Sequence, residues 1–205
     1  MSDHHKETFI TKYIFSMDHK MIAKQFLITG MLMAVLGMLM SAIFRVQLAN
    51  PGESSILYSL LPGSWVNEMG ALNPDKYLAL VTMHGTILVF WVLTAGLSGT
   101  FANFLIPLQI GARDMASGFL NMLSYWFFFI ATVVLISSIY VQGGPASGGW
   151  TIYPPLSALP QAIPGSGAGM TLWLVSITLF VVGSLLGGLN YIVTILNLRT
   201  KGMSM

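Results

Sequence analysis

The chain has 205 residues, of which only 8% are charged while 55% are hydrophobic. Soluble globular proteins carry about 25% charged residues, so this chain has too few polar groups to cover a water-exposed surface. The net charge of +2 is too small to suggest nucleic acid as a partner, and the absence of cysteine excludes disulfides, thiolate metal sites and cofactors attached through cysteine. The composition therefore predicts an integral membrane protein.

The N-terminal stretch, MSDHHKETFITKYIFSMDHK, is polar and mixed in charge. It lacks the basic flank and short apolar core of a cleavable signal peptide. We therefore expect the first apolar segment to stay in the membrane as a span. The histidine pair at positions 4 and 5 lies in this polar tail, and we expect it to be solvated rather than to bind metal.

Four apolar segments are long enough to cross a hydrocarbon core of about 30 Å, which needs about 20 helical residues. They cover approximately residues 22–44, 77–106, 119–141 and 170–197. Because lipid offers backbone groups no hydrogen-bond partners, and because no barrel-like alternation occurs, we expect α-helices. Small residues four apart indicate close helix contacts, as in the pairs Gly30 and Ala34, Gly37 and Ser41, and Gly183 and Gly187. The predicted fold is all-α, a polytopic transmembrane helix bundle over residues 1–205.

The positive charges are divided unevenly between the two sides of this bundle. With four spans, the N-terminus, the 107–118 link and the C-terminus share one side. That side holds seven of the nine Lys and Arg residues, namely Lys6, Lys12, Lys20, Lys24, Arg113, Arg199 and Lys201. The other side has only Arg45 and Lys76. The positive-inside rule therefore predicts that both termini lie on the cytoplasmic side.

A histidine, His84, lies in the apolar run VTMHGTILVFW, roughly 10 Å below the outer end of the second predicted span. In an α-helix, Leu88 and Trp91 share its face, and Gly85 beside it could admit a flat ligand. An imidazole inside a membrane is either an axial ligand of haem iron or a histidine that hydrogen-bonds a neighbouring helix. The residues alone leave both interpretations open.

Polar residues near the ends of the predicted spans also allow both structural and functional interpretations. Arg45 is a snorkelling interfacial arginine or part of a site, and Asp114 is a turn residue, an ion-pair partner of Arg113 or part of a site. Four further residues could hydrogen-bond helices together or line a water-filled proton path: Asn103, Asn121, Ser184 and Asn190.

Seven phrases in the sequence carry a resemblance to a known family. They are MDHK, FRVQLANPG, MHGTILVFW, NFLIPLQIGARDMA, LNMLSYW, GWTIYPPLS and LNYIVTILNLRTKGM. In this order and at these spacings they resemble subunit I of the haem-copper oxidases, of the cytochrome c oxidase type. The resemblance runs over nearly the whole chain, and it implies that residues 1–205 form the N-terminal four spans of the twelve-helix subunit I fold.

The resemblance implies a site for low-spin haem a. His84 matches an axial ligand of the haem iron and is the only metal ligand implied within this segment. Arg45 matches the arginine that hydrogen-bonds the formyl group of haem a. Trp150 and Tyr153 match outer-loop residues near the haem propionates.

The resemblance also implies part of the D proton channel. Asp114 matches the aspartate at the channel mouth, and three residues match polar side chains further in: Asn103, Asn121 and Ser184. The chain departs from the family pattern nearby, because Arg113 replaces a proline, Met122 replaces a second asparagine, and paired serines are reduced to Gly183 and Ser184. These changes put the tuning of the channel and its pumping stoichiometry in doubt.

As a whole, the resemblance implies a respiratory enzyme of the bacterial inner membrane that oxidises cytochrome c, reduces O2 to water and translocates protons. Haem a3, CuB and the second ligand of haem a are implied in the remainder of subunit I, so the chain alone is not expected to reduce oxygen or to contain catalytic residues. The implied partners are that remainder, subunits II and III, cytochrome c or another donor, and membrane lipid, without nucleic acid. Two alternatives are a quinol oxidase and a non-enzymatic four-helix membrane module.

Overall fold

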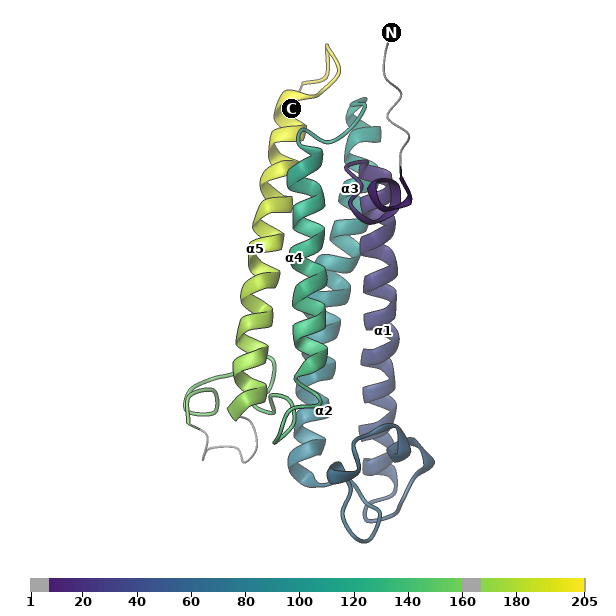
Figure 1. Ribbon diagram of the computed structural model, residues 1–205, viewed down its shortest axis with the longest axis vertical. Helices are drawn as coiled ribbons and strands as arrows, with labels where there is room; N and C mark the ends of the chain where they lie inside the picture. Colours follow the sequence, from purple (N-terminus) through teal and green to yellow (C-terminus); the bar gives the residue numbers. More distant parts are fainter. Residues whose placement is uncertain (1–7, 160–166, 205) are drawn as a thin grey trace.

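The computed structural model describes residues 8–159 and 167–204, so Lys6 and the histidine pair lie outside the described residues. Four helical segments are long and apolar enough to cross a membrane, which confirms the predicted all-α bundle (Figure 1). The second span joins α2 (Pro74–Thr86), a π-helical segment, η4 (Ile87–Leu97), and α3 (Ser98–Ile110). The other spans are α1 (His19–Ala49), α4 (Gly118–Ser137) and α5 (Gly167–Asn197).

Short polar residues and glycine define several helix ends. The side chain of Asp18 accepts a hydrogen bond from Met21 N at 2.9 Å at the start of α1. Ser117 Oγ accepts one from Leu120 N at 3.2 Å at the start of α4. Both contacts satisfy donors that a helix leaves unpaired at its N-terminus. Gly111 ends α3 with a φ of 70°, a left-handed conformation that glycine adopts without steric cost.

The third span ends at Ser137, although the apolar pattern continues to residue 141. Ser138 Oγ donates to Leu135 O at 2.6 Å, and the backbone passes into turns after it. Hydroxyl groups that bond nearby backbone carbonyls compete with helix hydrogen bonding. The apolar pattern therefore extends a few residues past the point at which α4 ends.

The π-helical segment changes which residues share a face with His84. Thr94 Oγ1 donates to Val89 O at 2.8 Å, a separation of five residues that fits the wider π turn. Trp91 is fully buried and donates through Nε1 to Thr132 Oγ1 on α4 at 2.9 Å. The expectation that Trp91 lies on the face of His84 was therefore wrong, because it assumed α-helical spacing through this segment.

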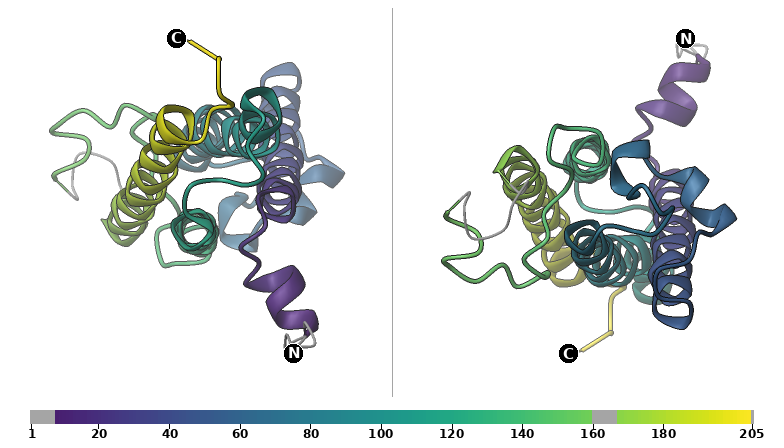
Figure 2. Two further views of the ribbon diagram at one scale, coloured as in Figure 1. Left: turned by 90° about the horizontal axis from the view of Figure 1, so that it is seen from above. Right: turned by 90° about the horizontal axis from the view of Figure 1, so that it is seen from below.

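Close backbone contacts join the helices, and Figure 2 shows the four spans end-on. A Cβ atom on Gly30 of α1 would lie 2.8 Å from Gly96 Cα in η4, so no side chain fits there. A Cβ atom on Gly183 of α5 would lie 2.9 Å from Ser124 O on α4. The small residues that the sequence marked at positions 30 and 183 therefore lie at helix–helix contacts, where they let backbones approach closely.

The bundle has two distinct ends (Figure 1). The end that we call the termini end holds the start of α1, the link from residue 111 to 117, and residues 198–204 after α5. Thr200 N donates to Ile110 O there at 3.0 Å. The other end, the loop end, holds residues 50–73 and 138–159. The two candidate sites lie toward opposite ends of the bundle.

Candidate functional site

The imidazole of His84 is held by a backbone carbonyl of the neighbouring helix. His84 Nδ1 lies 2.8 Å from Gly37 O on α1. A carbonyl oxygen only accepts, so Nδ1 carries the proton and donates it. In the neutral imidazole with this tautomer, Nε2 has a lone pair that can bind a metal. The ring is half-buried, and Phe44 packs edge-on against it with ring centroids 5.4 Å apart.

Arg45 lies on α1 on the loop-end side of this contact. Its Nε donates to Ser41 Oγ at 3.2 Å, and its side chain is exposed. Gly37, Ser41 and Arg45 follow one another at intervals of four residues, so they form one row that runs about 12 Å along the helix. The row begins at the residue that holds His84. The guanidinium therefore lies on the same side of α1 as the imidazole contact, with planar donors that suit an oxygen acceptor.

The loop at residues 149–153 brings one of its two aromatic candidates to this region. A Cβ atom on Gly85 would lie 3.5 Å from the Trp150 ring, so the indole rests against the helix next to His84. Gly149 N donates to Thr82 Oγ1 at 2.8 Å, which fastens the loop to α2. The flat space expected beside Gly85 is therefore covered by Trp150. Tyr153 is 69% exposed, and the structure does not bring it to the same contact.

Together these residues fit an axially bound haem. The hydrogen bond from Nδ1 to a carbonyl fixes the tautomer in which Nε2 can bind iron, as in protein metal sites generally. Among the described residues, no three His, Cys, Asp or Glu side chains are grouped as they would be in a site for a free metal ion. The imidazole of His84 is the group in this region with the chemistry of an axial ligand of haem iron.

The link at the termini end holds Asp114, which has no ion-pair partner among the described residues. Its Oδ1 accepts a hydrogen bond from Met115 N at 2.7 Å, and the side chain is half-buried. Within residues 8–159 and 167–204, the single salt bridge joins Lys76 to Asp75 at 2.9 Å. Arg113 therefore does not pair with Asp114, and the carboxylate keeps acceptor capacity beyond its local turn.

Asn103 on α3 and Asn121 on α4 are both fully buried. Asn103 Nδ2 donates to Gly99 O at 2.7 Å and to the hydroxyl oxygen of Tyr191 at 3.0 Å. Its Oδ1 has no partner among the described residues, and neither carboxamide atom of Asn121 has one. Leaving such a group unpaired costs about 1–3 kcal/mol, so buried amides are normally paired with protein or water.

Asn190 has a structural role that the sequence could not separate from a path-lining one. Its Oδ1 accepts from Ser117 N at 2.9 Å, and its Nδ2 donates to Ser117 O at 3.1 Å. These two bonds tie α5 to the start of α4. Asn190 therefore holds helices together, unlike the unpaired Asn121.

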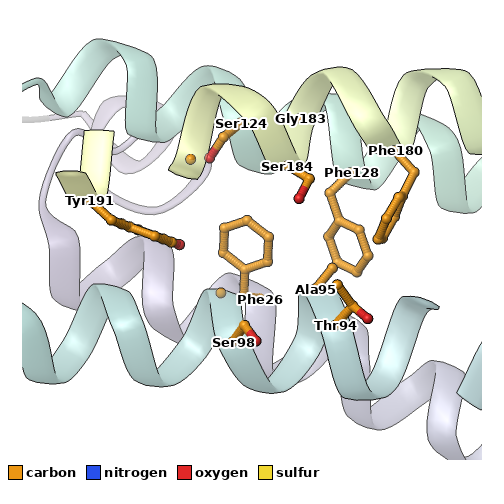
Figure 3. A pocket seen from close by; sticks show the side chains of 12 residues that line it. Phe26, Thr94, Ala95, Ser98, Ser124, Phe128, Phe180, Gly183, Ser184 and Tyr191 are labelled. Carbon is orange, nitrogen blue, oxygen red and sulfur yellow. The ribbon is translucent and has the colours of Figure 1, made fainter. Parts of the chain in front are cut away.

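A cavity lies between α1, the second span, α4 and α5 (Figure 3). It offers about 60 Å³ for water, whereas one water needs at least about 10–15 Å³ on this measure. Polar side chains that line it are Thr94, Ser98, Ser124, Ser184 and Tyr191. Ser184 thus opens onto the cavity, whereas Asn103 and Asn121 are not among the residues that line it.

Sequence reasoning assigned no role to two residues of this region. His19 is buried, and its Nδ1 donates to Asn103 O at 2.8 Å. Tyr191 binds the Asn103 side chain. Both lie in quoted phrases, MDHK and LNYIVTILNLRTKGM. A histidine and a tyrosine near the ends of apolar spans are the signal that could have marked them.

The fold and the two regions define an integral membrane protein with a metal-compatible imidazole toward one end and a buried polar cluster toward the other. Residues 21–205 match the family model described as "Cytochrome C and Quinol oxidase polypeptide I". The chain therefore belongs to this family, as its phrases predicted.

Curated relatives agree with this assignment. The chain is 41% identical over 202 residues to the "Alternative cytochrome c oxidase subunit 1" of Bradyrhizobium diazoefficiens, which covers 98% of this chain and 32% of the relative. It is 35% identical to the "Cytochrome c oxidase subunit 1" of Synechocystis sp., and the match covers 100% of this chain and 33% of that relative. It is 33% identical to the "Cytochrome c oxidase subunit 1" of Cereibacter sphaeroides, and the match covers 99% of this chain and 38% of that relative. The chain thus spans about a third of the length of these relatives.

Proposed function

We propose that this chain binds low-spin haem a and forms the mouth of the D proton channel in subunit I of a respiratory terminal oxidase. In the assembled enzyme, electrons from cytochrome c and protons from the inner side reduce O2 to water, with coupled proton translocation. The remainder of subunit I supplies the second haem ligand, haem a3 and CuB, and subunits II and III complete the complex. The chain contributes electron and proton routes rather than the oxygen-reducing centre.

The observation that carries the haem assignment is the contact between His84 Nδ1 and Gly37 O. It directs the proton of the imidazole to α1 and leaves Nε2 for iron. When bound, haem a supplies a one-electron carrier. Arg45 would donate to an oxygen at the haem edge, and its positive charge would favour added electron density there. Trp150 would close the loop-end side of the site against water.

The proton assignment is supported by charge and by the buried polar groups. Seven of the nine Lys and Arg residues lie at or next to the termini end by sequence, which favours that end as the cytoplasmic side. Asp114 lies in the link at this end with acceptor capacity to spare. Neutral amides and hydroxyls behind it can hold water and pass protons without a fixed charge that would trap them.

An optical spectrum of the purified complex tests the haem assignment. We expect His84→Ala to remove the low-spin haem a band. His19→Ala is a matched control, because His19 also bonds a backbone carbonyl through Nδ1. Unlike His84, it lies at the start of α1, at the termini end of the bundle. Subunit content measured on the same samples separates loss of haem from loss of assembly. An intact complex in which His84→Ala keeps the full band would refute the assignment.

A quinol oxidase is the second candidate, because the description of the matching family names both cytochrome c and quinol oxidases. The haem and proton residues of this chain suit both. A dinuclear copper site in the partner subunit would favour cytochrome c as the donor, and its absence from an active complex would favour quinol. A haem-free spectrum of the intact complex would favour a non-enzymatic membrane module.

A further inference from the structure

Tyr191 lies on α5 where its hydroxyl meets both Asn103 and the cavity (Figure 3). The two amide hydrogens of Asn103 Nδ2 are directed to Gly99 O and to the Tyr191 oxygen. The Tyr191 oxygen is therefore the acceptor in this pair. Its own hydrogen remains available as a donor toward the cavity.

Ser124, which lies on α4, has the opposite hydrogen-bonding role: it accepts from the cavity, whereas Tyr191 donates. Its Oγ donates to Asn121 O at 2.7 Å and is almost fully buried. With its single hydrogen used in this way, the oxygen has lone pairs that accept from the cavity side. Ser124 thus bonds the backbone carbonyl of Asn121 on its own helix, whereas Tyr191 bonds the carboxamide of Asn103 from another helix.

Gly187 separates these two hydroxyls. A Cβ atom built on Gly187 would lie 3.7 Å from Tyr191 Oη and 3.7 Å from Ser124 Oγ. Because glycine has no side chain, this space stays open between a donor on one side and an acceptor on the other. A water there could accept from Tyr191 and donate to Ser124, which are complementary roles.

We propose that Tyr191, Ser124 and the space over Gly187 form a junction that joins the Asn103 carboxamide to the cavity, from which the proton path continues toward Ser184. Tyr191 is a positioning residue, since it holds the Asn103 carboxamide and directs a donor into the water position. This inference rests on the proposed proton-path function.

The first test compares two buried tyrosines in the assembled oxidase. Tyr191→Phe keeps the ring and removes the hydroxyl that bonds Asn103. Tyr125→Phe is the control, because Tyr125 also bonds one side chain, Thr29 at 3.1 Å, but does not line the cavity. We expect Tyr191→Phe to slow proton uptake about fivefold, the rate equivalent of one hydrogen bond, and to raise its solvent deuterium isotope effect. The control should change neither quantity, and both variants should keep the haem spectrum.

The second test fills the space without touching the tyrosine. Gly187→Ala places a methyl group at ordinary contact distance between the two hydroxyls. Gly188→Ala is the control on the same helix, because a Cβ atom there would meet nothing within 4 Å. We expect slower proton uptake only in Gly187→Ala.

Asp114→Asn, measured in parallel, separates the inference from the function on which it rests. If Asp114→Asn slows uptake while Tyr191→Phe and Gly187→Ala match their controls, the junction is wrong and the path stands. If Asp114→Asn leaves uptake unchanged, the proposed path fails and the junction fails with it. If Tyr191→Phe and Tyr125→Phe slow proton uptake to the same extent, the junction is also wrong, because equal slowing would indicate general loosening of the bundle.

Discussion

Asn121 and Asn190 are two buried asparagines for which the structure predicts opposite responses to the same substitution. The two polar carboxamide atoms of Asn121 have no partner in the part of the chain that the structure describes, whereas both of those of Asn190 bond the backbone of Ser117. Leucine has the same number and branching of side-chain heavy atoms as asparagine and no polar atoms. Asn→Leu therefore removes an unpaired amide at position 121 and a paired one at position 190.

The magnitudes follow from this difference. Asn190→Leu leaves the N–H of Ser117 without its partner and removes one of the two hydrogen bonds to the C=O of Ser117, which still accepts from Asn121 N at 3.1 Å. At about 1 kcal/mol for the half-buried N–H and less than this for the C=O, we expect a loss of about 1–2 kcal/mol in the free energy of unfolding. Asn121→Leu removes two polar atoms that lack protein partners, so we expect stability to be unchanged or to rise by up to about 2 kcal/mol. The same variant should slow proton uptake, because Asn121 is a residue of the proposed proton path. A residue of this kind is retained for its function although it lowers stability.

Thermal or SDS-induced unfolding of the purified complex measures the stability, and a pH-indicator dye measures the rate of proton uptake. Asn121→Leu should unfold at or above the parent midpoint, and Asn190→Leu below it. The reasoning is refuted if Asn121→Leu destabilises the protein as much as Asn190→Leu does, or if it leaves proton uptake at the parent rate.

Two further predictions concern the haem side and the packing of α1. Arg45→Met should lower the reduction potential of the low-spin haem by about 60–130 mV, the equivalent of a charge-assisted hydrogen bond of about 1.5–3 kcal/mol, and a redox titration that finds no change would contradict the role of Arg45. Gly30→Ala should destabilise the bundle by about 1–3 kcal/mol in a thermal unfolding measurement, because its Cβ would meet Gly96 Cα at 2.8 Å, whereas Gly188→Ala, with open space around it, should not.

The sequence by itself determined the membrane class, the four spans and the family. The few charges and long apolar runs are properties of composition and length, and lipid allows such runs only one common backbone solution, the helix. Ordered phrases such as MHGTILVFW and GWTIYPPLS were specific enough to predict the family that the comparisons confirm. These phrases also marked His84, Arg45 and Asp114 as candidates, and their roles stay predictions.

Only the tertiary structure decided which atoms meet. His84 and Gly37 are 47 residues apart, and Tyr191 and Asn103 are 88 apart, so no local pattern contains either hydrogen bond. The π-helical segment after Thr86 changed which side chains share a face, which α-helical spacing cannot foresee. Asn121 and Asn190 are the same residue type in similar apolar surroundings of the sequence. One is paired and the other is not because a buried amide is satisfied by whichever groups the packed helices bring within hydrogen-bond distance.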